Sequence, residues 1–243
     1  MVDNLLTSLK NLTSQGRLSE ALRVFSLVQI HVSSINSCDI VLQSISSLLS
    51  SCTSLKALSP GKQLHAHIVA LGFERNPVLV PKMVAFYSTF NLLVDAHVVT
   101  ESSNVLHTLP WNLLVFSYVK NGLFGEALCV YKQMVRKGIR ADNFTYPAVL
   151  KACGERLDLG FGREVHESIE ASTQPWSLFV HNALIAMYAR FGLMDVARRL
   201  FDEMPERDSV SWSTMISAYA SRGVWKEAFE LFEMVSSSFQ GTQ

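Results

Sequence analysis

The sequence predicts an all-α protein of the α-solenoid class, in which helix–turn–helix repeats stack on one another. One observation is a long internal repeat, since residues 48–68 match residues 149–169 at a constant offset of 101 positions. Another is a shorter motif that begins at a glycine and recurs along the chain, as GRLSEALRVF from Gly16, GLFGEALCVY from Gly122, GLMDVARRLF from Gly192 and GVWKEAFELF from Gly223. Self-similarity with a period of about 20–50 residues is the signature of repeat architectures.

Each repeat is expected to contain two helices joined by a tight turn. The glycine ends the first helix, and an apolar face with helical spacing begins after it. Five positions after the glycine, or after Asn91 in a weaker copy, stands an alanine that lets two helices cross closely, and an aromatic residue follows four positions later. The alanines are Ala21, Ala96, Ala127, Ala197 and Ala228, and the aromatic residues are Phe25, Tyr131, Phe201 and Phe232, with Thr100 as the exception.

Laying the copies end to end predicts a single solenoid domain over residues 1–243. Its seven repeats are residues 2–41, 42–76, 77–107, 108–142, 143–177, 178–208 and 209–243. Their lengths are 40, 35, 31, 35, 35, 31 and 35 residues, so three successive repeats account for the offset of 101. Because one helix pair cannot bury its own apolar face, neighbouring pairs are expected to stack into a superhelix with a concave binding surface.

The composition is that of a folded chain without a strong charge. Of 243 residues, 49% are hydrophobic, and 21 Lys and Arg balance 21 Asp and Glu, which gives no general attraction to nucleic acid or to a membrane. No apolar run reaches the roughly 20 residues needed to cross a bilayer, so no membrane partner is predicted. The N-terminus shows neither a signal peptide nor a transit peptide pattern.

Several segments resemble the plant pentatricopeptide repeat family, namely residues 60–68, 134–154 and 181–220. The alternation of 35, 35 and 31 residues resembles one subclass of that family. The resemblance implies a right-handed superhelix. Tetratricopeptide arrays are the alternative with the same architecture, but their W-x-x-L-G-x-x-Y pattern is missing. After Met234 the ending SSSFQGTQ differs from the basic end expected of the family, so repeat 209–243 is interpreted as atypical and the chain as a truncated gene product.

In that family each repeat faces one base of single-stranded RNA, which is read by the fifth and the last residue of the repeat, while an apolar second residue wedges between bases. The resemblance therefore implies uridine readers in two repeats, an adenine-type pair in a third and a purine preference in the last. The implied base-reading residues are, in that order, Asn112 with Asp142, Asn182 with Asp208, Ser46 with Asn76, and Ser213. The implied wedges are Leu109, Phe179 and Val210. Three pairs fit no readable combination: Leu6 with Val41, Pro81 with His107, and Pro147 with Ser177.

A structural interpretation of the same residues stays open. Asn112 and Asn182 can be ordinary polar residues of a first helical turn, and Asp142 and Asp208 can be N-caps of the next helix. Capping and base reading are compatible roles for one carboxylate. The recurrence of the same residue types in two repeats favours base reading.

No catalytic, cofactor or metal site is predicted. The cysteines Cys38, Cys52, Cys129 and Cys153 form no C-x-x-C pair, and the HESIE segment from His166 lacks the second histidine of a zinc protease helix. His65 and His166, at equivalent positions, are expected to pack between helices. The deaminase motifs H-x-E and P-C-x-x-C, found in longer members of the subclass, are absent.

The sequence thus predicts a non-enzymatic, sequence-selective RNA-binding protein. By resemblance it acts in a mitochondrion or chloroplast, with the mitochondrion favoured, in transcript processing or editing catalysed by a separate protein. The alternative is a helical scaffold that binds a partner protein in its groove. The charge of repeat 108–142 favours RNA, because Lys120, Lys132, Arg136, Lys137 and Arg140 outnumber Glu126 and Asp142.

Overall fold

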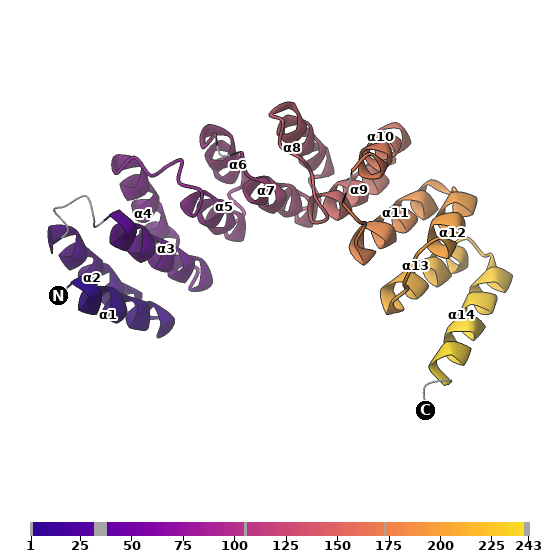
Figure 1. Cartoon of the computed structure of the whole chain (residues 1–243), viewed down its shortest axis with the longest axis horizontal. Coiled ribbons are helices and arrows are strands. Elements are labelled where there is room, and N and C mark those ends of the chain that lie inside the picture. Colours follow the sequence, from indigo (N-terminus) through magenta and orange to yellow (C-terminus); the bar gives the residue numbers. More distant parts are fainter. Residues whose placement is uncertain (1, 32–37, 105, 173, 241–243) are drawn as a thin grey trace. The chain divides into compact units, whose positions relative to one another are not determined.

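A computed structural model describes residues 2–31, 38–104, 106–172 and 174–240, and these residues form fourteen α-helices and no strand (Figure 1). The all-α prediction is therefore confirmed. The helices are α1 (Val2–Ser14), α2 (Leu18–His31), α3 (Cys38–Ser54), α4 (Leu58–Ala70), α5 (Leu79–Thr89), α6 (Leu93–Ser102), α7 (Thr108–Lys120), α8 (Phe124–Arg136), α9 (Thr145–Arg156), α10 (Leu159–Glu170), α11 (Leu178–Phe191), α12 (Met194–Asp202), α13 (Ser209–Ala220) and α14 (Trp225–Gln240).

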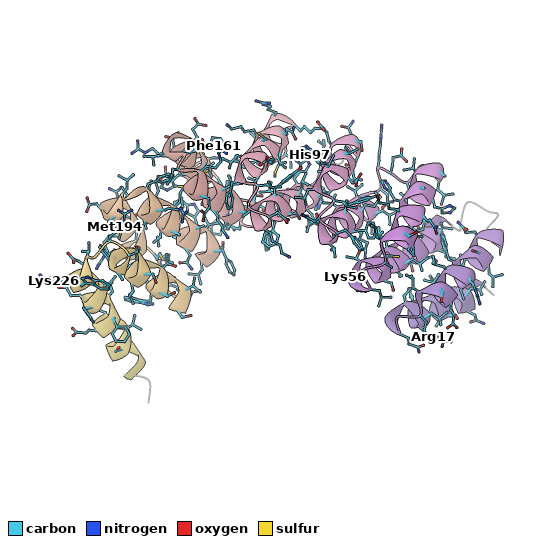
Figure 2. All side chains as sticks on the ribbon, turned by 180° about the vertical axis from the view of Figure 1, so that it is seen from behind. Arg17, Lys56, His97, Phe161, Met194 and Lys226 are labelled. Atoms are coloured by element: carbon cyan, nitrogen blue, oxygen red, sulfur yellow. The ribbon has the colours of Figure 1, made fainter. Side chains whose placement is uncertain are left out.

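Each predicted repeat contains one odd-numbered helix followed by one even-numbered helix, here called its first and second helix, except that α3 begins at Cys38, four residues before the predicted start of the second repeat. Residues 32–37 of the predicted first repeat and 241–243 of the last lie outside the described residues. Arg17 and Lys56, labelled in Figure 2, lie in the turns of the first two pairs. No helix in the described part of the chain has the length and hydropathy needed to cross a bilayer.

The turn glycines of the recurring motif adopt a backbone conformation that favours glycine. Gly122 has a φ of +72° and Gly192 a φ of +87°, both in the left-handed region. The residue after each glycine donates its N–H to a carbonyl five positions back, as in the 3.0 Å bond from Leu193 to Tyr188. This is the Schellman ending of a helix, and it explains why the motif starts with glycine.

The chain divides into two compact units, Met1–Ser117 and Tyr118–Gln243, which are described separately. In the N-terminal unit the first helices α1, α3 and α5 contact one another in a row, and each packs on its own second helix. In the C-terminal unit α9, α11 and α13 form the corresponding row, and the second helices α8, α10 and α12 each also contact the next first helix. This is the helix-pair stacking of an α-solenoid. One continuous array over residues 1–243 stays a prediction.

The alanine and aromatic positions of the motif form the contacts between helices. Ala127 and Ala197 are fully buried, as a close helix crossing requires. Phe201 is buried against Trp212 of the next first helix, with ring centroids 4.9 Å apart in an edge-to-face arrangement. At the equivalent position of the last repeat, Phe232 is exposed.

The internal repeat with an offset of 101 residues produces the same helix–helix contact in both units. His65 of α4 and Tyr87 of α5 are joined by a 2.7 Å hydrogen bond between Nδ1 and the hydroxyl. His166 of α10 and Tyr188 of α11 are joined in the same way at 2.9 Å. Burial lowers the pKa of both histidines, which favours the neutral rings. The packing role predicted for these histidines is confirmed.

Candidate nucleic-acid interface

The predicted base-reading residues occupy equivalent places on first helices. Asn112, Asn182 and Ser213 are each the fifth residue of their helix, on α7, α11 and α13. Ser46 lies further along its helix, because α3 begins at Cys38. Asn182 is almost completely buried, Asn112 and Ser46 are half-buried, and Ser213 is exposed. Because stacked repeats share one geometry, side chains at the same position of successive first helices are aligned within each unit.

The last residue of five successive repeats accepts a hydrogen bond from the start of the next first helix. Asp208 Oδ1 accepts the Ser211 N–H at 2.8 Å in a capping box, and Asp142 Oδ1 accepts the Phe144 N–H at 2.9 Å. The other three bonds are Val78 N–H to Asn76 Oδ1 at 2.9 Å, Leu109 N–H to His107 Nδ1 at 3.2 Å, and Val180 N–H to Ser177 Oγ at 3.4 Å. The capping role considered for Asp142 and Asp208 is therefore present, and His107 and Ser177 share it.

The structure brings the predicted reading pair Asn182 and Asp208 together. Asn182 Nδ2 lies 3.4 Å from Asp208 Oδ1, so the amide donates to the carboxylate that also caps α13. Ser211 is the main cause of the lowered pKa of Asp208, through its backbone N–H and its hydroxyl, and the Asn182 amide adds to the effect. The ionised carboxylate fixes the orientation of the amide, because only the nitrogen can donate.

The carbonyl side of the same amide is left without a partner. Asn182 is 8% exposed, and no protein atom in the described part of the chain donates to its buried Oδ1. A buried acceptor without a donor costs about 1–3 kcal/mol. A donor brought to Oδ1 would recover that free energy.

Asn182 lines a groove of about 420 Å³ between α9, α11 and α13. Pro147 and Lys151 contribute from α9, and Val210 and Thr214 from α13. A second groove of about 770 Å³ lies between α11 and α13 and includes Ser213. Both grooves lie on the row of first helices within the C-terminal unit.

Large apolar side chains are exposed at the second position of five repeats. The predicted wedges Leu109, Phe179 and Val210 are 45%, 74% and 53% exposed. Phe144, 81% exposed, and Val78, 58% exposed, occupy the same position in two repeats whose fifth and last residues fit no base-reading pair of the family. The sequence interpretation missed these two residues, although their position in the repeat was sufficient to find them.

The remaining predicted base-reading residues make separate contacts. Asn76 makes its side-chain hydrogen bonds to the backbone of Val78 and Leu79 and not to Ser46. Ser213 Oγ donates to the Val210 carbonyl at 3.0 Å. Asn112 belongs to the N-terminal unit and Asp142 to the C-terminal unit, so each is described only within its own unit.

The basic residues of repeat 108–142 are divided between its two helices and the turn that follows, and Lys120 ends the first helix α7. Lys132 and Arg136 lie on the second helix α8, whereas the reading positions lie on first helices. The Lys132 ammonium sits 4.1 Å from the ring centroid of Phe161 on α10, a residue labelled in Figure 2. A charge count over a whole repeat therefore does not by itself place charge beside the reading positions, and the preference for RNA inferred from it stays a prediction.

The described cysteines and histidines form no metal-binding cluster, and burial disfavours a reactive thiolate at Cys52 and Cys153. Within the described ranges no group of three or more His, Cys, Asp or Glu side chains is arranged to hold a metal ion. Burial raises the pKa of the Cys52 thiol to about 11 and that of Cys153 to about 12, which disfavours thiolate formation. His166 Nε2 lies 3.6 Å from Glu170, which is a pairwise contact only.

Comparisons with known proteins agree with this geometry. The PPR repeat family model matches residues 108–155, and the PPR repeat model matches residues 179–209 and 210–238. Pentatricopeptide repeat-containing protein At1g22830 of Arabidopsis thaliana is 52% identical over 94% of this chain and 32% of its own length. The Arabidopsis proteins At1g15510, chloroplastic, and At3g13770, mitochondrial, are 33% and 30% identical over 93% and 94% of this chain, and 26% and 35% of their own lengths.

The crystal structure of the pentatricopeptide repeat protein PPR10 in complex with an 18-nt psaJ RNA element matches 98% of this chain and 36% of its own, with a TM-score of 0.74 at 18% identity. At that identity the likeness establishes the fold, and the molecule is a helical repeat protein of the α-solenoid class. The chain belongs to the pentatricopeptide repeat family. It spans about a third of the length of the relatives that it matches.

Proposed function

We propose that this chain binds single-stranded RNA with sequence selectivity, one base per repeat, and that Asn182 with Asp208 is its best-defined reader. The observation that carries the proposal is the buried Asn182 amide, whose nitrogen is held by Asp208 and whose Oδ1 has no donor among the described residues. The PPR10 structure contains bound RNA and shares this fold, which supports the choice of ligand.

The orientation of the amide favours particular bases. Oδ1 is an acceptor, so it complements a ring N–H, which uracil presents at N3 and guanine at N1. Cytosine and adenine present an unprotonated ring nitrogen at the corresponding edge, and two acceptors facing each other would repel. Within this choice, the family pattern of Asn with Asp indicates uridine.

The exposed second positions supply contacts that do not depend on sequence. Phe179 and Val210 precede the reading positions of adjacent first helices, and both side chains are more than half exposed. Aromatic or apolar surface against a base contributes about 1–3 kcal/mol per base when the two stack. With RNA and protein running parallel, repeats 108–142 to 209–243 would select 5′-U-N-U followed by a purine.

The relatives suggest where this binding takes place. Their names include both chloroplastic and mitochondrial proteins, so we propose an organelle as the site of action, in transcript processing or editing. A separate protein would supply any catalysis.

Selection from a random RNA pool with the purified protein tests this function. Enrichment of RNAs that contain U-N-U followed by a purine is the expected result. Retention of RNA without any enriched sequence would contradict base reading. Failure to retain RNA in low salt would contradict RNA binding and favour the alternative, a helical scaffold for a partner protein.

A further inference from the structure

The groove at Asn182 extends beyond the position that reads the base. Pro147, Lys151 and Glu155 line it from α9 at intervals of four residues, and Asn182, Ala186 and Arg190 line it from α11 at the same intervals. Side chains four residues apart lie on the same helix face, one above the other. Eight residues of helix span about 12 Å, so the groove continues for two turns past the reading position. A base at Asn182 would leave its ribose and phosphate beside the following turn.

Two arginines near this groove, Arg190 and Arg222, are already engaged. Arg190 donates to the Gly154 carbonyl at 3.0 Å and forms a 2.6 Å ion pair with Glu155. Arg222 donates to the Ala189 carbonyl at 2.6 Å. Each guanidinium therefore binds the C-terminal end of the preceding first helix, where free carbonyls and the helix dipole favour a cation. The Glu155 charge is balanced by Arg190 inside the same groove.

Lys151 differs from these arginines. Its side chain is exposed on the groove, and among the described residues its ammonium has no ion pair and no hydrogen bond. Its neighbours Pro147 and Ala186 carry no charge, and Glu155, four residues further along α9, is paired with Arg190. Once Glu155 and Arg190 cancel, the positive charge of the groove is that of Lys151.

We propose that Lys151 binds the phosphodiester of the nucleotide whose base Asn182 and Asp208 read. This inference rests on the proposed function, and it adds an electrostatic contact on the first helix α9. A lysine suits the role because a flexible point charge follows a phosphate without demanding a fixed geometry. At the position equivalent to Lys151, the next two first helices have uncharged residues, Ala186 on α11 and Ser217 on α13. The contact is therefore specific to this groove within the row α9, α11 and α13.

The variant Lys151→Gln tests the assignment, with Lys62→Gln on the second helix α4 as a matched control at another exposed lysine. The dissociation constant of the RNA selected by the full chain is measured over a series of salt concentrations. Lys151→Gln is expected to weaken binding about two- to fivefold at low salt, the scale of an exposed ion pair. The slope of log affinity against log salt should fall by about 0.7, the value for one phosphate of a single strand. Lys62→Gln should change neither quantity.

Three results would overturn the proposal. An unchanged salt slope in Lys151→Gln would remove Lys151 from the phosphate contact while the RNA-binding function stands. A changed base preference would assign Lys151 to base reading. Absence of RNA binding by the unaltered chain would reject the proposed function together with the phosphate contact. Melting curves confirm that both variants are folded, since both positions are exposed.

Discussion

The molecule contains the same three-helix segment twice, once in each compact unit. The N-terminal copy covers residues 58–107 (α4 to α6), and the C-terminal copy covers residues 159–208 (α10 to α12). Both copies place a glycine against the next first helix, and both join a histidine to a tyrosine hydroxyl. In both, the last residue caps the helix that follows.

The copies differ at the positions that would read a base. Pro81 of the N-terminal copy stands where the C-terminal copy has Asn182, and His107 stands where it has Asp208. Pro81 has no amide, and His107 accepts the Leu109 N–H as a cap. The residues that stack the helices and those proposed to read RNA therefore vary independently, which is what a modular reader would require.

The largest effect is expected from alanine at the helix-contact glycines. A Cβ on Gly61 would overlap the ring of Phe86, whereas a Cβ on Gly162 would meet the flexible side chain of Met187, with Sδ at 2.8 Å. Overpacking of this kind costs about 1–3 kcal/mol, which exceeds the gain of about 0.5–1 kcal/mol from replacing a helical glycine. Gly61→Ala should lose more stability than Gly162→Ala in denaturant unfolding.

Gly160→Ala is the matched control, because the nearest atom to its added Cβ is Asp158 Oδ1 at 3.8 Å. This variant should be neutral or slightly stabilised. Equal unfolding midpoints for Gly61→Ala and Gly160→Ala would contradict the close approach of α4 and α5.

The fold was predictable from the sequence to a greater extent than the site. Glycine at +87° and alanine at a crossing have no good substitutes, so the motif around Gly192 and Ala197 revealed the helix pairs directly. The pairing of Asn182 with Asp208 was implied by the family resemblance, applied to the repeat boundaries. The unpartnered Oδ1 and the engagement of Arg190 depend on contacts between repeats, which the residue order alone does not specify.

The second-largest effect is expected on the base preference of the C-terminal copy when Asn182 is replaced. Asn182→Thr removes the amide that Asp208 orients, and the preference at the second uridine of U-N-U should move toward a purine. Losing one oriented hydrogen bond of this kind costs about 1–2 kcal/mol, or roughly 5- to 30-fold in affinity for uridine. Competition binding with RNAs changed at one position measures it. An equal loss at every position would indicate nonspecific binding.

A graft into the N-terminal copy should have a smaller effect. Replacing Pro81 by Asn and His107 by Asp reproduces the reading pair on an equivalent scaffold, and Asp can retain the cap on α7. A uridine preference of about threefold to tenfold should appear three bases 5′ of the second uridine, less than at Asn182 because the surrounding groove was not selected for it. The single change Pro81→Asn serves as the control. No new preference in the double variant would show that the two copies are not interchangeable.

The smallest effect is a dependence of stability on pH that distinguishes the copies. Burial lowers the pKa of His65 and His166 in the folded chain, so unfolding takes up protons near and below the ordinary histidine value of 6.5. Their contribution to stability is complete above about pH 6.5 and is lost as the pH falls toward the folded pKa values.

His166 has Glu170 at 3.6 Å to stabilise its protonated ring, and His65 faces the charge of Asp95. Replacing Glu170 by Gln should therefore make the chain more sensitive to acid without changing its stability near pH 7.5, where His166 is neutral. Thermal melts between pH 7.5 and 5.5 provide the measurement, with Lys62→Gln as an unrelated surface variant. A melting temperature of Glu170→Gln that follows the unaltered chain across this range would show that Glu170 does not act through His166.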